Sequence, residues 1–189
     1  MKNTYTGMKK FSSIFENNDI HDGILVIVDV QKEFSDFIPK NLVDELHKYA
    51  ENFDTVYQVW DSNKASKPSY IFPNEKKSVV KKYGTTFSNE LVYYKNNLKD
   101  VLTKEGDRYK FNDTDSYLIR VGNKHAWFYM PEEMSDLFKT MNNKNIVLVG
   151  GASGECLYDI EIAMKSFGIN PIYNNRYVYS AKTKNTQVI

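Results

Sequence analysis

The stretch ILVIVDV, residues 24–30, decides the fold. It begins with five consecutive apolar residues, four of them β-branched, and then reaches an acid, Asp29, without a polar interruption. A continuous β-branched run of this kind is typical of a strand that is buried on both faces, as strands are in parallel sheets covered by helices. We therefore predict a buried strand over residues 24–28, with Asp29 at its carboxyl end.

The segments around this strand alternate between helical and strand patterns. Apolar residues at helical spacing predict helices within 42–53, 134–141 and 156–167, the last closed by Gly168 as a left-handed cap. Apolar runs predict strands at 55–61, 146–149 and 169–173, and one more in the first half of 116–129. A further helix is expected over 90–102. Short crossovers imply parallel neighbours, so we expect an α/β fold with a mainly parallel sheet.

The composition is that of one globular domain, 1–189. The chain has 189 residues, 41% of them hydrophobic, and no linker-like stretch, which suits one sizeable core. A formal net charge of +1 provides no overall field to recruit nucleic acid or an anionic membrane. The polar beginning, the lack of a membrane-spanning apolar run and the single cysteine lead us to expect a soluble, cytoplasmic protein without an internal disulfide.

A glycine-rich turn, GGASGEC at 150–156, precedes the third predicted helix. A dinucleotide-binding turn is one interpretation, but the glycines lack the G-x-G-x-x-G spacing, and the chain has no acid about twenty residues later. The alternative is a nucleophile. Ser153 could cap the helix and place Cys156 in its first turn, where the helix dipole and backbone N–H groups stabilise a thiolate. A lone cysteine can also be an ordinary packing residue.

A nucleophilic Cys156 needs a base, and Asp29 is the natural candidate. It follows a fully apolar strand of the same sheet, where a carboxylate requires a polar partner to offset its desolvation. In open α/β sheets, functional groups collect beyond the carboxyl ends of the strands, which is where both residues are expected. Asp29 could instead be a turn or cap residue at the point where the chain leaves the sheet.

Two short motifs give the chain a family resemblance. Asp29, Gln31 and Phe34 match Asp-x-Gln-x-x-Phe, and Gly150, Ala152, Ser153 and Cys156 match Gly-x-Ala-Thr-x-x-Cys with serine in place of threonine. Over roughly residues 22–61 and 116–180, the sequence resembles the isochorismatase-like cysteine hydrolases, a superfamily that includes nicotinamidases and other small amidases.

The resemblance implies a three-layer α/β/α fold and a set of catalytic roles. Asp29 would be the base, Cys156 the nucleophile, and the amides of Ala152 and Cys156 the oxyanion donors. The Gly151–Ala152 peptide would be cis. Relatives are commonly homo-oligomers, so a homo-oligomer is expected here as well.

The family's third catalytic residue, a lysine, has two candidate positions. Lys81 lies six residues before a phenylalanine, as in one family stretch, while Arg120 stands at the lysine position of SYLIRVGNKHAW. Spacing to Cys156 favours Arg120, which would act electrostatically because arginine does not readily relay protons. With Arg120 in this role, residues 62–115 become an enlarged excursion over the site. Lys82 and Lys124 remain possible cations.

The remaining site predictions concern the pocket walls and metal. The candidate substrate-binding residues are aromatic side chains and one histidine: Phe34, Trp60, His125, Trp127 and Phe128. Nicotinamidases carry Asp-x-His after the second strand, whereas this chain has Asp61 followed by Ser62 and Asn63. Asp61 alone is a poor metal site, so we expect neither a metal nor another cofactor.

These residues predict a cysteine-dependent hydrolase of a small amide or related C–N substrate, acting through a thioester. Two alternatives stay open. One is an isochorismatase-type hydrolase of a vinyl ether, for which the thiol is dispensable, and the other is a non-catalytic binding module on the same fold. No nucleic acid or membrane partner is expected.

Overall fold

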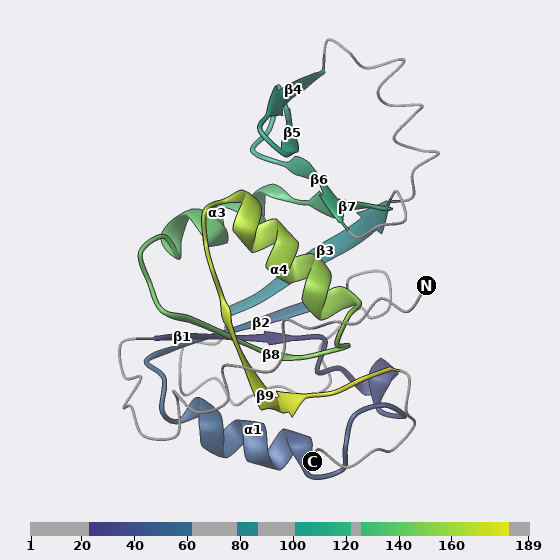
Figure 1. Ribbon diagram of the computed structural model, residues 1–189, viewed down its shortest axis with the longest axis vertical. Coiled ribbons are helices and arrows are strands. Elements are labelled where there is room, and N and C mark those ends of the chain that lie inside the picture. The colour runs from purple at the N-terminus through teal and green to yellow at the C-terminus, as the bar shows by residue number, and fades with distance from the viewer. Residues whose placement is uncertain (1–22, 62–78, 87–100, 122–125, 182–189) are drawn as a thin grey trace, which may run out of the picture.

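The computed structural model describes residues 23–61, 79–86, 101–121 and 126–181, with the backbone alone for 60, 61, 79–86, 121 and 126–128 (Figure 1). The elements are β1 (Ile24–Val28), a 3₁₀ turn η1 (Lys32–Phe34), α1 (Leu42–Ala50), β2 (Thr55–Asp61), β3 (Val79–Thr86), β4 (Leu102–Glu105), β5 (Arg108–Phe111), β6 (Tyr117–Val121), β7 (Ala126–Met130), α3 (Glu132–Thr140), β8 (Ile146–Gly150), α4 (Cys156–Ser166) and β9 (Ile172–Val178).

The strand that decides the fold lies in the middle of a parallel array. β1 pairs in parallel with β2 on one side and with β8 on the other, and the array continues to β3 and β9, also in parallel. All five residues of β1 are buried, as the apolar run predicts. The predicted strands at 24–28, 55–61 and 146–149 are confirmed, and so is the α/β class.

The other half of the sheet is antiparallel. The strand order is β4-β5-β6-β7-β3-β2-β1-β8-β9, and every pairing from β4 through β7 to β3 is antiparallel. The expectation of a mainly parallel sheet is therefore corrected to a mixed sheet. The physical reason is the short connections: β4 and β5 meet at the turn residues Gly106 and Asp107, which permit a hairpin but no crossover.

Two further sequence expectations concern this region. The range 62–115, predicted as an excursion, contains β3, which pairs with β2 and so belongs to the sheet itself. The helix expected over 90–102 falls mainly outside the described residues, and its last residue, Leu102, begins β4.

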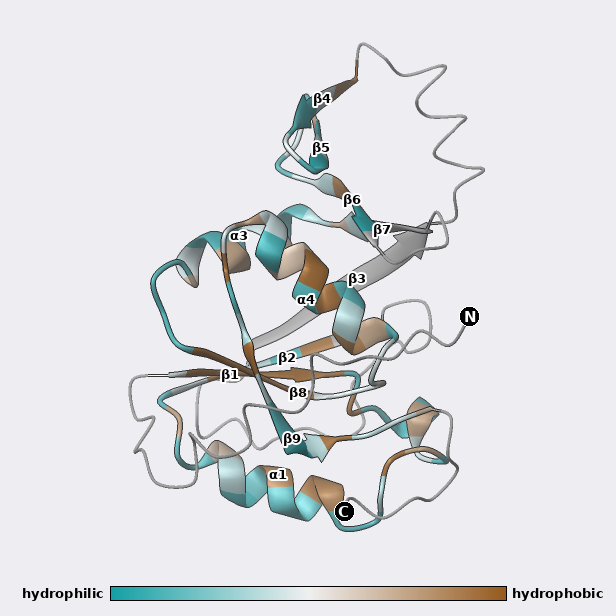
Figure 2. Ribbon diagram, viewed as in Figure 1, coloured by the Kyte–Doolittle hydropathy of each residue, from teal (hydrophilic) through white to brown (hydrophobic). Residues whose placement is uncertain are grey.

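Helices cover both faces of the parallel array. Leu25 and Ile27 of β1 face one apolar cluster with Leu42 and Leu46 of α1. The alternate residues of β1, such as Val26, belong to the cluster formed with α3 and α4. Figure 2 shows β1 and β8 as brown strands between these helices. The carboxyl and amino ends of the strands are therefore the places where polar groups can reach a pocket.

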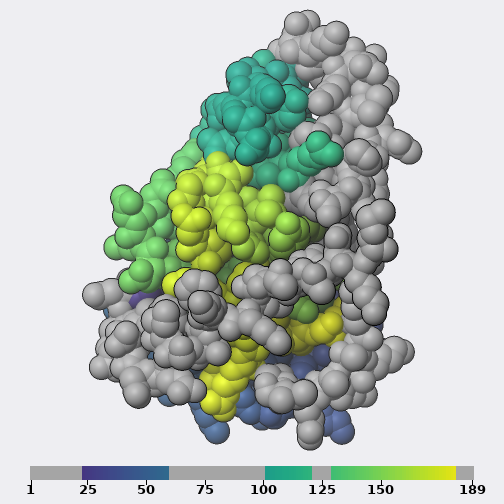
Figure 3. Space-filling view, viewed as in Figure 1, coloured from purple at the N-terminus to yellow at the C-terminus, as the bar shows by residue number. Residues whose placement is uncertain are grey.

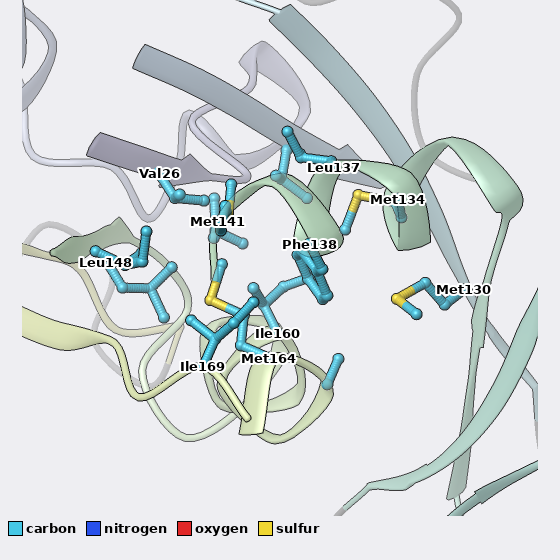
Figure 4. Packing of buried hydrophobic residues seen from close by; sticks show 14 of the residues in the cluster. Val26, Met130, Met134, Leu137, Phe138, Met141, Leu148, Ile160, Met164 and Ile169 are labelled. Atoms are coloured by element: carbon cyan, nitrogen blue, oxygen red, sulfur yellow. The ribbon is translucent and has the colours of Figure 1, made fainter. Parts of the chain in front are cut away.

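The helix pair on one face, α3 and α4, packs through long apolar side chains. Met134 and Phe138 of α3 meet Ile160 and Met164 of α4, and all four are fully buried (Figure 4). α4 is followed by Gly168, whose φ of 78° confirms the predicted left-handed cap. Among the residues that the structure describes, no helix is long and apolar enough to cross a membrane.

Candidate active site

The register of the parallel strands brings the ends of β1 and β8 to one edge of the sheet. Val28 lies opposite Gly150 on one side and Val59 on the other. The residues that follow, Asp29 and the turn at 150–156, therefore leave the sheet next to each other. This is the carboxyl edge, where functional groups of open α/β sheets collect.

Asp29 is held in place by its backbone. The residue is 0% exposed and has a φ of 51°, a left-handed conformation that aspartate tolerates better than most side chains. Its N–H donates to the carbonyl of Val59 at 2.8 Å, and its own carbonyl accepts from the N–H of Gln31 at 2.9 Å. The turn after β1 is thereby fixed, and Asp29 is a buried acid at the carboxyl edge.

The glycine turn is tied to strand β1. The N–H of Gly151 donates to the carbonyl of Val28 at 3.0 Å. Gly150 has a φ of 98°, and a Cβ at this position would lie 2.1 Å from the same carbonyl oxygen, so no larger residue fits without a shift. The Gly151–Ala152 peptide is cis, as the resemblance implies.

Tyr179, just after β9, holds the turn from the other side. Its N–H donates to the carbonyl of Gly150 at 2.9 Å, and its carbonyl accepts from Ser153 at 2.9 Å. Its hydroxyl donates to the carbonyl of Asp29 at 2.7 Å, so one residue contacts both halves of the predicted site. A Cβ on Gly151 would lie 2.6 Å from its ring.

The sequence analysis missed Tyr179. The feature that could have pointed to Tyr179 is its position just after the last strand, at the same edge of the sheet as Asp29. Burial, followed by the charges of Asp29, Cys156 and Glu155, raises the pKa of Tyr179 above its usual range, so the hydroxyl stays protonated and donates.

Cys156 is the first residue of α4 and is half-buried against the core beneath that helix. The helix dipole favours a negative sulfur at this position. The expected cap by Ser153 is corrected, because the N-cap residue is Glu155 and no side chain caps the helix. The turn is closed by backbone bonds instead, with the N–H groups of Glu155 and Leu157 both donating to the carbonyl of Ala152.

Ala152 is the other predicted oxyanion donor. It is buried in the turn, and its carbonyl is occupied by the bonds that close the turn. None of the backbone hydrogen bonds recorded between described residues uses its N–H.

A second acid, Asp159, lies in the first turn of α4, three residues after Cys156. Burial, with the neighbouring charge of Glu155 as the smaller cause, raises the pKa of Asp159 to about 6. Glu155 itself is exposed. The surroundings of Cys156 thus contain two acids that the sequence analysis did not consider.

The structure separates the two candidates for the third catalytic residue. Lys81 lies on β3 opposite Val59, in the same lateral row as Val28 and Gly150, and the backbone of Lys82 is one residue further. Arg120 lies on β6, four strands from β1 in the sheet order. Arg120 pairs with Trp127 of β7, and Trp127 pairs in turn with Thr86 at the end of β3. The side chain of Arg120 is exposed. The backbone register therefore brings Lys81 level with Val28, the residue before Asp29, and does not bring Arg120 there.

The remaining predicted residues belong to several different elements. Phe34 ends η1 and packs, partly buried, against the cluster under α1. Trp60 and Asp61 are the last residues of β2. Trp127 and Phe128 lie on β7, opposite Thr86 and Thr85 of β3. His125 and Lys124 lie outside the described residues.

Two further findings concern metal binding and similarity to known proteins. Within the described ranges, no group of three or more histidine, cysteine or acidic side chains is placed to hold a metal ion. Comparison of the chain with protein-family models, with curated proteins and with solved structures gives no match.

Proposed function

We propose that the protein is a cysteine-dependent hydrolase of a small amide or related C–N substrate, with an isochorismatase-like hydrolase fold. One observation carries the proposal. The turn that precedes Cys156 is hydrogen-bonded to the end of β1, and Tyr179 forms hydrogen bonds both with this turn and with Asp29. A buried acid and a cysteine at a helix start thus share one rigid edge of the sheet, which is the arrangement that an acid–nucleophile pair requires.

The chemistry uses residues of this edge. Asp29 accepts the proton of the Cys156 thiol, and the sulfur attacks the carbonyl carbon of the substrate. The electron pair of the C=O bond moves to oxygen, where the N–H groups of Ala152 and Cys156 stabilise the charge, with one such donor lowering the barrier by about 3 to 4 kcal/mol. The C–N bond then breaks, and the amine leaves with the proton held by Asp29.

Water completes the cycle. It attacks the thioester, loses a proton to Asp29, and releases the carboxylic acid and the free thiol. Lys81 is the better candidate for the third catalytic residue, because its backbone is in register with the end of β1. A cation there would favour the ionised form of Asp29.

The test measures the rate of iodoacetamide alkylation of Cys156 against pH. In the parent chain, the thiol is expected to titrate below about 8.5, the value of an unperturbed cysteine. Asp29→Asn should change that titration. The control is Asp54→Asn, which removes the same charge from an exposed residue just before β2, at the opposite edge of the sheet. Thermal unfolding of each variant checks that it is folded, and Asp29→Glu keeps a carboxylate should the amide not be tolerated.

An unreactive thiol, or identical titration in the parent and Asp29→Asn chains, would contradict the proposal. A reactive pair leads to a screen of small amides for ammonia release, in which Cys156→Ala should abolish turnover. Retained hydrolysis by Cys156→Ala would instead support the vinyl-ether type of chemistry, for which the thiol is dispensable.

A further inference from the structure

One cavity lies away from the Asp29–Cys156 edge. It has a volume of about 450 Å³ and lies between the β4–β5 hairpin, strand β6 and the carboxyl end of α4. Figure 3 shows the teal atoms of the hairpin against the yellow-green atoms of α4. The residues of α4 that line the cavity run from Ile162 to Ser166, roughly 9 to 15 Å from Cys156 along the helix axis.

The side chains around the cavity carry a surplus of positive charge. Lys104, Arg120 and Lys165 line it, against a single acid, Asp107. Lys165 is neutralised by Glu161, whose carboxylate lies 2.6 Å from its Nζ. Lys104 and Arg120 form no ion pair with any residue in the described part of the chain.

Other cationic side chains of this region, unlike Lys104 and Arg120, form ion pairs with acidic residues of the protein. Arg108 pairs with Glu105 at 3.2 Å, Lys110 with Asp115 at 2.6 Å, and Lys139 with the same aspartate at 2.5 Å. The cations of this region that do not line the cavity therefore have carboxylate partners on the protein. Two of the three that line it do not, and their charge is available to a ligand.

The same cavity has an apolar part. Ile119, which is 1% exposed, and the half-buried Ile162 contribute to its lining, and Tyr109 adds an aromatic ring. Small-molecule sites typically combine apolar and aromatic walls with a few convergent polar groups. The lining suits an anion that carries an apolar or aromatic body better than a bare inorganic ion.

The walls of the cavity are held together before any ligand arrives. Arg108 of β5 donates from Nη1 to the carbonyl of Ser166 at the end of α4. Its guanidinium also lies 4.0 Å from the ring centroid of Phe167 and 5.0 Å from that of Tyr117. These contacts fix the hairpin on the helix, so a ligand does not have to supply the free energy of ordering them.

We propose that this cavity binds a small organic anion, a phosphate ester or carboxylate with an apolar or aromatic body, through Lys104 and Arg120. The site is separate from the proposed hydrolase site and does not depend on it. Each of the two cations makes a charge-assisted contact, and loss of either should weaken binding roughly tenfold.

The test is a titration of the full chain with phenyl phosphate and with benzoate, followed by ¹H–¹⁵N NMR. Saturable shifts are expected for the amides of residues 104–109, 119–120 and 162–166 with at least one of the two anions. Phenol, which has the ring without the charge, should cause no saturable shift. Arg120→Gln and Lys104→Gln should each weaken binding by the stated factor.

The matched control is Lys144→Gln, which removes one positive charge from an exposed residue just before β8. It should leave the affinity unchanged. The spectra themselves report whether each variant is folded. The proposal is overturned if neither anion produces saturable shifts at these amides, or if Lys144→Gln weakens binding as much as Arg120→Gln.

Discussion

A single carboxyl group, that of Asp159, gives the molecule a pH-dependent stability. Its pKa is raised from 3.8 to about 6, mainly by burial and secondly by Glu155. A raised pKa means that the folded state binds the proton more tightly than the unfolded chain does. The stabilising contribution of this group is therefore complete below pH 3.8 and is lost as the pH rises through about 6.

Asp159→Asn removes the buried charge and should stabilise the protein at pH 8, by about 1 kcal/mol once partial solvent screening is allowed for. At pH 3.5 the same substitution should have little effect, because the carboxyl is then protonated in both states. Thermal unfolding at the two pH values measures the difference. Asp113→Asn, at an exposed turn residue, is the control, and an equal effect of Asp159→Asn at both pH values would contradict the assignment.

At the scale of residues, the sequence indicated Asp29 and Cys156 as candidates, because an acid after an apolar strand and a cysteine after a glycine turn are local patterns. The sequence could not identify Tyr179. Its hydroxyl bond to Asp29 joins residues 150 positions apart, and nothing local to either residue records it. The cap by Ser153 was mispredicted for a related reason: backbone donors to Ala152 already close the turn.

At the scale of elements, the turn between β8 and α4 shows why two of its glycines are not equivalent. Gly150 and Gly154 both have positive φ, 98° and 74°. A Cβ on Gly150 would overlap the backbone of Val28, whereas a Cβ on Gly154 would have no atom within 4 Å. Both glycines have a left-handed backbone conformation, but only Gly150 is crowded by neighbouring atoms.

This difference predicts unequal effects of alanine. Gly150→Ala should destabilise the fold by about 3 kcal/mol or more, because strain and overlap add. Gly154→Ala should cost about 1 kcal/mol, from the left-handed backbone alone. Urea unfolding of both variants measures the two effects. Similar losses would show that β1 and the turn do not pack as closely as described.

Elements with strong apolar runs were predictable, and the others were not. The strand at 24–28 has the predicted bounds because burial on both faces requires continuous apolar residues, and the strand at 55–61 also has the predicted bounds, although its run is interrupted by Gln58. β3 reads VVKKYGTT, a mixture of apolar and polar residues without alternation, and its place is fixed by partners on both sides. Such a strand is defined by tertiary pairing rather than by its own sequence.

At the scale of the whole molecule, Arg108 joins the antiparallel half of the sheet to the helical layer. It belongs to β5, and its contacts to Ser166, Phe167 and Tyr117 lie on α4, the residue after it and β6. The hairpin has otherwise a small apolar cluster around Leu118, with Leu102, Tyr109 and Phe111 packed against it. One side chain therefore contributes a large share of the docking of this hairpin.

Arg108→Gln should loosen the hairpin without unfolding the parallel array. Amide hydrogen exchange in β4 and β5 is expected to accelerate about tenfold or more, while exchange in β1 and β8 stays unchanged. Arg176→Gln is the control, since this exposed arginine lies 3.6 Å from Glu45 at the other end of the molecule's sheet order. Uniform acceleration in all strands would show that the two halves unfold as one unit.

The bond between Tyr179 and Asp29 also has a consequence for the order in which the chain is completed. Strand β1 and the turn at 150–156 are both synthesised before residue 179, yet Tyr179 contacts each of them. These contacts cannot form in a nascent chain until residue 179 has emerged from the ribosome. The cysteine therefore emerges from the ribosome before the residue that fixes its turn, and the geometry around the thiol is completed only after residue 179 has emerged as well.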